Sequence, residues 1–89
     1  MAKSTGDKWE IWNVGFQTPV FGMENTYSKD VKWMMISTKG GESDATAACK
    51  KYHPGCRVVC TLSRLEYATP GVADEVVKLA LSRLEGGTQ

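Results

Sequence analysis

Glycine and proline clusters divide this chain into five short segments, and this punctuation limits its possible folds more than any other feature. The clusters lie at 19–22, 39–41, 53–55 and 69–70, and Gly86 follows the last segment. Proline lacks an amide donor and glycine readily adopts turn conformations, so both end regular elements. Each segment between clusters is long enough for one strand or one helix. The sequence therefore predicts a single small domain of five elements.

Three segments have the apolar patterns of strands. Segments 8–16 and 31–38 carry apolar side chains at both odd and even positions, which for 8–16 favours a central or covered strand. Segment 56–62 alternates strictly, which predicts one core face and one wetter face. The expected core face comprises Cys56, Val58, Cys60 and Leu62. The connection 17–30 is long and has room for a short strand near residues 20–21.

Two segments have helical periodicity. The first is expected to begin at an N-cap Ser43 and to end before Pro54. Its apolar face would comprise Ala45, Ala48, Cys49 and Tyr52. The second is expected to follow a capping Thr69, with Pro70 as its first residue. Its apolar stripe would comprise Ala73, Val76, Val77, Ala80 and Leu84.

The resulting order, β-β-α-β-α, predicts an α+β fold. We expect a three-stranded antiparallel or mixed sheet with two helices, spanning residues 8–85. Segments 1–7 and 86–89 are polar or glycine-rich and are expected to be flexible ends.

Composition and cysteine usage predict a cytoplasmic protein with no membrane partner. Hydrophobic residues make up 42% of the 89 residues and charged residues 24%, as in an ordinary soluble domain. The polar N-terminus resembles no signal peptide, and no apolar run approaches the roughly 18 residues that cross a bilayer. The three cysteines are an odd number without a secretory signal, which favours reduced thiols.

Four potential zinc ligands lie close together in the sequence: Cys49, His53, Cys56 and Cys60. Zinc ligands must meet within a few Å around one ion. On a strand, however, Cys56 and Cys60 would lie about 13 Å apart. We therefore expect no metal and keep this cluster as the alternative.

The same region offers no catalytic motif around its single histidine, and the Lys39-Gly40-Gly41 turn has the wrong order for a phosphate-binding loop. The sequence therefore predicts a protein that is not an enzyme and needs no cofactor.

Charge is concentrated in the middle of the chain, although the net charge is only +1. Residues 27–64 hold seven basic and three acidic side chains, whereas residues 65–89 hold two basic and four acidic ones. A basic face on the central β-α-β unit would suit an acidic protein surface or nucleic-acid phosphates. A mixed solvated surface is the alternative. The candidate partner-binding residues are Arg57, Arg64, Lys50, Lys51, Lys32 and the potential anchor Trp33.

Several short sequence features of this chain occur in the same order in small phage accessory proteins. They are Lys8-Trp9, the helix start Glu42-Ser43-Asp44-Ala45, Tyr52, Pro54-Gly55 and Arg57-Val58-Val59. Over residues 8–67 the chain loosely resembles the family of phage inhibitors of host bacterial RNA polymerase. The resemblance implies a three-stranded sheet with one helix and strand-borne arginines that bind an acidic polymerase surface. The chain departs from that pattern in its longer first connection and its additional last helix.

Two main functions follow from the sequence. The first is a small, non-enzymatic, phage-type inhibitor that binds a host protein, with transcription machinery as the candidate target. The second is a nucleic-acid-binding module that uses the basic face and tryptophan stacking. Self-association as a virion or scaffold subunit is a third hypothesis.

Overall fold

The computed structural model describes residues 8–86 and contains a three-stranded antiparallel sheet with three helices. The elements are β1 (Glu10–Gln17), β2 (Lys32–Thr38), α1 (Gly41–Tyr52), β3 (Arg57–Ser63), α2 (Arg64–Ala68) and α3 (Val72–Gly86). The strand order is β2-β1-β3, so β1 is central. This architecture confirms the predicted α+β fold. Of the expected flexible segments 1–7 and 86–89, Gly86 is the last residue of α3, and residues 1–7 and 87–89 lie outside the described residues.

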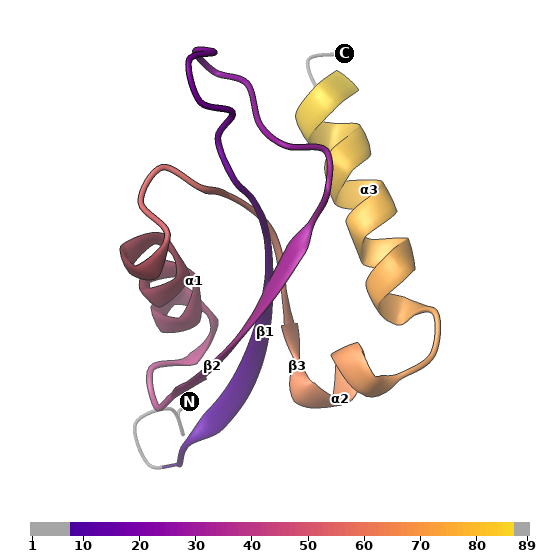
Figure 1. Ribbon diagram of the computed structural model, residues 1–89. Helices are drawn as coiled ribbons and strands as arrows, with labels where there is room; N and C mark the ends of the chain where they lie inside the picture. Colours follow the sequence, from indigo (N-terminus) through magenta and orange to yellow (C-terminus); the bar gives the residue numbers. More distant parts are fainter. Residues whose placement is uncertain (1–7, 87–89) are drawn as a thin grey trace.

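The helices lie on opposite faces of the sheet (Figure 1). On one face α1 contacts all three strands, whereas on the other α3 contacts β3 and α2 contacts β1 and β3. The second face is therefore covered mainly over β3, and the part formed by β2 has little helical cover. Within residues 8–86, no helix is long and apolar enough to cross a membrane.

The main hydrophobic core lies between α1 and the sheet. Even-numbered residues of β1 point toward α1, and Val14 and Phe16 are buried there. They pack with residues of β2 and α1, and the His53 ring stacks on Phe16 with centroids 4.6 Å apart. Complete burial of one such apolar side chain contributes about 1.5–3 kcal/mol. The other core residues are Ile36, Ala45 and Cys49.

The opposite face is packed around a glycine. A Cβ atom on Gly15 would lie 3.1 Å from the Trp33 ring and 3.2 Å from the Cys60 sulfur. The absence of a side chain at Gly15 therefore lets the Trp33 indole lie against the central strand. Trp33 in turn makes an edge contact with Tyr67 of α2, with centroids 4.9 Å apart. The small size of Gly15 thus allows Trp33 to contact both the central strand and α2.

A β-bulge in β3 corrects the alternation predicted from the sequence. Phe16 pairs with Val58 and Gly15 with Cys60, so Val59 is an extra residue without a partner. Directly paired residues share a face, and the bulge therefore moves Val58 to the α1 face while Cys60 and Leu62 lie on the other. The prediction of one common core face for these residues was wrong because strict alternation assumes an unbroken ladder.

The predicted boundaries of α1 also need correction. The helix begins at Gly41, with Gly40 rather than Ser43 as N-cap and no side-chain cap hydrogen bond. Ala45 and Cys49 are buried as expected, but Tyr52 is 67% exposed. Tyr52 was predicted to be in the core because it extends the i, i+3, i+4, i+7 pattern. Tyr52 is the last residue of this short helix, however, and its side chain lies beyond the edge of the core.

The region after β3 differs most from the prediction, because it contains the short helix α2. Thr69 ends α2 instead of capping the next helix, and its hydroxyl donates to the Leu65 carbonyl oxygen at 2.8 Å. The following helix, α3, begins at Val72, two residues later than expected. Its predicted stripe is half-buried except for Leu84, which is exposed.

The connection between β1 and β2 extends beyond the sheet as a narrow loop (Figure 1). It contains a single bridge between Pro19 and Tyr27, not a strand at 20–21. Its base is fixed by the buried Gln17, whose side-chain oxygen accepts bonds from Arg57 Nε at 3.1 Å and Nη2 at 2.6 Å. The Arg57 guanidinium also lies 4.7 Å from the centroid of Tyr27. These contacts attach the loop to β3.

Candidate functional site: an aromatic surface beside α2

A capping box fixes α2 against the end of β3. The Ser63 hydroxyl accepts a bond from the Glu66 amide at 3.2 Å, and the Glu66 carboxylate accepts one from the Ser63 amide at 2.9 Å. Two amides that would otherwise lack partners at a helix start are thereby satisfied. The residues that follow Ser63 are consequently held in a defined position beside the sheet.

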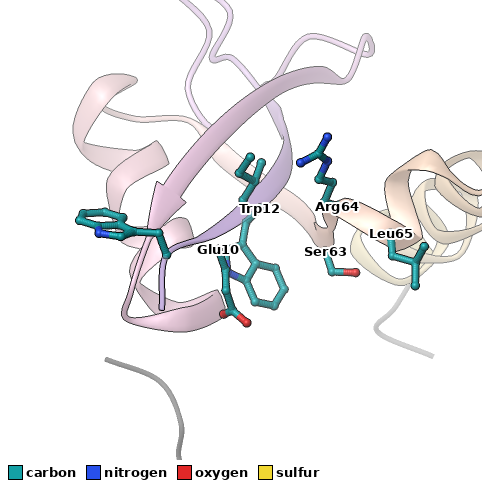
Figure 2. A pocket seen from close by; sticks show the side chains of 7 residues that line it. Glu10, Trp12, Ser63, Arg64 and Leu65 are labelled. Carbon is teal, nitrogen blue, oxygen red and sulfur yellow. The ribbon is translucent and has the colours of Figure 1, made fainter. Parts of the chain in front are cut away.

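Two hollows adjoin at the start of α2, and Arg64 lines both. The first, of about 370 Å³, lies where β1 extends past the end of β3, and its lining includes Trp9, Trp12 and Leu65. Figure 2 shows Glu10 and Trp12 of β1 together with Ser63, Arg64 and Leu65 around this hollow. The second hollow, of about 350 Å³, lies over the open part of the sheet. It is lined by Asn13, Trp33, Met35, Arg64, Tyr67 and Ala68.

The two hollows share Arg64 in their linings, and exposed apolar side chains lie around both. Met35 is 72% exposed, Leu65 78% and Trp9 67%. Large apolar side chains that are exposed singly need no explanation, but a continuous patch of them marks an interaction site. We call this patch the aromatic surface. It comprises Trp9, Trp33, Met35, Arg64, Leu65 and Tyr67.

Several members of the aromatic surface are held by the fold. Trp33 is fixed between Gly15 and Tyr67, as described above. The Lys39 ammonium lies 5.5 Å from the centroid of Trp9, within the range of a cation–π interaction. The indole N–H of Trp12, in the wall of the first hollow, is buried and has no hydrogen-bond partner among residues 8–86. The contacts of Trp33 with Gly15 and Tyr67 preorganise this part of the aromatic surface, which lowers the entropic cost of binding.

The structure does not bring the six partner-binding candidates together. Arg64 and Trp33 belong to the aromatic surface, and Arg57 is half-buried against Gln17 and Tyr27 at the other end of β3. The three lysines are exposed on the other side of the sheet: Lys50 and Lys51 lie in the last turn of α1, and Lys32 pairs with Phe16 on the α1 face. The positive charges are therefore distributed around the domain.

The four potential zinc ligands are also separated. Among residues 8–86, no group of three or more histidine, cysteine or acidic side chains is placed to hold a metal ion. The bulge places Cys60 against Gly15, on the face opposite the core residue Cys49. His53 stacks on Phe16. The Cys49 and Cys56 thiols are near neighbours, and the His53 backbone is hydrogen-bonded to both residues, but its ring lies against Phe16.

The cysteine environments favour the protonated thiol. Burial, with a smaller contribution from Cys56, raises the pKa of Cys49 from 9.0 to about 12. Burial also raises the pKa of Cys60, although a hydrogen bond with the Gly15 backbone opposes the shift. Because the thiolate is the nucleophilic and metal-binding form, both environments suppress thiol chemistry at neutral pH.

Leu65, Tyr67 and Met35 were not predicted from the sequence to be members of a binding surface. One signal was available, because Ser63-Arg64-Leu65-Glu66 is a Ser-x-x-Glu pattern, which predicts a helix start. That pattern would have predicted α2 and placed Leu65 and Tyr67 on it. No sequence pattern indicated the exposure of Met35, because this exposure depends on how much of the sheet α3 covers.

Comparisons with protein-family models, curated proteins and solved structures found no significant match to this chain.

Proposed function

We propose that this chain is a non-enzymatic protein-binding module whose aromatic surface receives an apolar anchor from a partner protein. In this proposal the anchor enters the hollows beside α2, and Arg64 pairs with an acidic group at their shared rim. The observation that carries the proposal is the clustering of exposed Trp9, Met35 and Leu65 around two adjoining hollows.

The residue types of the aromatic surface support a protein partner. Tryptophan, tyrosine, methionine and arginine are enriched at protein interfaces. Of these, tryptophan, tyrosine and arginine most often contribute the largest share of the binding energy. The aromatic surface combines all four types with a single guanidinium. A nucleic-acid site would be expected to carry several cations along its length, whereas Lys32, Lys50 and Lys51 lie on the other side of the sheet.

The resemblance to phage inhibitors of host RNA polymerase supplies a candidate partner. We propose that the chain acts by occupying a surface of a host protein in the bacterial cytoplasm, and polymerase is the first target to test. The binding residues proposed for this chain differ from the strand-borne arginines of that family. Here Arg57 is occupied by Gln17 and Tyr27, so Arg64 and the apolar side chains would supply most of the binding energy.

The experiment compares two exposed leucines. The tagged wild-type chain, Leu65→Asp and Leu79→Asp are used to capture proteins from a nuclease-treated bacterial lysate, and purified RNA polymerase is tested directly. Leu65 lies in the aromatic surface, whereas Leu79, which is also exposed, lies on α3 outside it. We expect Leu65→Asp to weaken capture of a stoichiometric partner by about thirtyfold, as at a binding hot spot. Leu79→Asp should retain it.

Equal capture by the two variants would contradict this site. The nucleic-acid alternative is favoured by the cations beside aromatic rings, Arg64 and the Lys39–Trp9 pair. It predicts that capture disappears after nuclease treatment and that affinity falls steeply with salt, with a slope that follows the number of phosphates contacted.

A further inference from the structure

The two outer edges of the sheet differ in their protection against further strand pairing. The β3 edge is interrupted by the bulge at Val59 and lies between α1 and α3, both of which contact β3. Bulges and helical cover are the usual ways in which proteins block an exposed edge. The β2 edge has neither a bulge nor a proline over its seven residues. Among residues 8–86, backbone hydrogen bonds outside the regular elements involve no residue of β2.

The β2 sequence is complementary to itself in one antiparallel register. With a two-fold axis at Met35, all seven residues pair: Met35 faces its own copy, Met34 faces Ile36, and Trp33 faces Ser37. Each pair joins two even-numbered or two odd-numbered residues, which lie on the same face of the sheet. Apolar Met34 and Ile36 therefore meet on the α1 face. Met35, Trp33 and Ser37 meet on the open face. A shift by an odd number of residues would place apolar and solvent-facing side chains on the same face.

The same register creates two complementary charge contacts. Lys32 of one copy lies directly opposite Thr38 of the other, on the α1 face. The Thr38 hydroxyl donates to the Asp44 carboxylate within its own chain at 3.4 Å. Lys32 is therefore brought beside the Asp44 carboxylate of the second copy, and the symmetry repeats this contact. Lys32 is the only charged residue of β2, so the register creates no like-charge pair within the strands.

The helices leave room for this pairing. Because α1 contacts all three strands, its axis lies near the central strand β1. With strands about 4.8 Å apart, the two α1 helices would be separated by roughly 14 Å. This separation exceeds the 8–10 Å of directly packed helices, so the two copies of α1 do not collide.

We propose that two copies of this chain associate through antiparallel pairing of their β2 edges, with Met35 on the two-fold axis, to form a continuous six-stranded sheet. The α1 helices then lie together on one face. On the other face, the two aromatic surfaces meet through the Met35 pair and become one continuous surface. The inference is independent of the proposed function, because association is measured on the purified chain with no partner present.

Disulfide cross-linking tests the register with a matched pair of variants. Directly opposed residues of antiparallel strands have Cα atoms about 4.5–5.5 Å apart, which suits a disulfide. Met35→Cys should therefore give a covalent dimer after treatment with the thiol oxidant diamide. Ser37→Cys is equally on the open face and exposed, but its copy lies four residues away along the strand, or about 13 Å. It should give at least tenfold less dimer, with the wild-type chain showing the background from its native cysteines.

Sedimentation velocity tests the association and the charge contacts without cross-linking. The reduced wild-type chain should change from monomer to dimer as its concentration rises toward about 1 mM, an affinity within the measurable range. Lys32→Glu should weaken dimerisation about tenfold, since two attractive contacts become repulsive. Lys50→Glu makes the same charge change on α1 and should have little effect. Combining Lys32→Glu with Asp44→Lys should restore association, with circular dichroism confirming that the variants fold.

A wild-type chain that remains monomeric throughout this range would overturn the proposal. Equal cross-linking by Met35→Cys and Ser37→Cys would overturn it too, because the copies would then meet without the defined register. Dimers that are unaffected by Lys32→Glu would place the interface elsewhere.

Discussion

The two faces of the sheet are formed by the same three strands but differ in what covers them. On the α1 face, Val14 and Phe16 are buried beneath a helix that crosses every strand. On the other face, Gln17 and Asn13 are buried polar residues, while Met35 is largely exposed. The α1 face contains a continuous apolar core, whereas the opposite face contains polar contacts and two hollows.

This difference indicates that one face of the sheet mainly stabilises the fold and the other is available for binding. An apolar layer sealed by α1 supplies the burial that a domain of this size needs. The opposite face can then leave Met35, Trp33 and Tyr67 accessible without unfolding the chain. Substitutions on the α1 face should therefore reduce stability, and those on the aromatic surface should mainly reduce binding.

Phe16→Ala should have the largest effect on stability. Phe16 is 2% exposed and contacts both the core and His53, so its removal leaves a cavity and should cost about 3–5 kcal/mol. A chain of this length is expected to have a total stability of roughly 5–13 kcal/mol. Urea denaturation measures the change. Met35→Ala on the open face is the control and should cost less than about 0.5 kcal/mol. Comparable losses would contradict the distinction between the faces.

Gly15→Ala should disturb the opposite face by a smaller amount. The added methyl group would lie 3.1 Å from Trp33 and 3.2 Å from the Cys60 sulfur, so the indole must move. We expect a loss of about 1–3 kcal/mol in denaturation, as for other overpacked sites, with a shift in tryptophan fluorescence. In a Trp33→Leu background the same substitution should cost less, because the ring is absent. An unchanged cost in that background would show that Trp33 is not the obstacle.

Raising the pH should destabilise the core through Cys49. Its pKa is raised from 9.0 to about 12 in the folded chain, so the thiol is protonated when folded and ionises on unfolding above about pH 9. The unfolded state then binds fewer protons, and stability falls as the pH rises through 9 toward 12. The expected loss from this group is on the order of 1 kcal/mol at pH 10. Urea denaturation of wild type and Cys49→Ala across this range isolates the effect. Parallel pH profiles would contradict it.

Ser63→Ala should have the smallest and most local effect. Loss of the capping hydroxyl should cost about 1 kcal/mol and speed hydrogen exchange of the α2 amides, while α1 amides remain protected. Ser43→Ala is the matched control, because Ser43 lies inside α1 and is not its cap. It should leave stability within about 0.5 kcal/mol of wild type. An equal effect at both serines would mean that the capping box does not hold α2.

Much of the fold could be predicted from local patterns. The strands, α1 and the last helix follow from periodicity and from glycine and proline signals, because these report conformations that a few neighbouring residues decide. Errors arose where local signals were weak or overlooked. The Ser63 capping box was present in the sequence, but its helix is only five residues long and has no apolar stripe of its own.

The candidate site was much less predictable, because its members are distant in sequence. Trp33 and Arg64 were singled out beforehand and do lie together, but the aromatic surface also needs Trp9, Met35 and Tyr67. Their proximity depends on β1 lying between β2 and β3 and on α2 turning back over the sheet. Charge counting could not show this, since it ignores which face each side chain occupies.

The sequence by itself determined the class of this protein, an α+β domain in which each element is specified by its own apolar period and its own end signals. Only the tertiary structure decided the strand order, the bulge that places Val58 and Cys60 on different faces, and the open region around Met35. The physical reason is that local conformation depends on interactions within a few residues. Strand pairing and the exposure of a face depend on packing between segments that the sequence keeps apart.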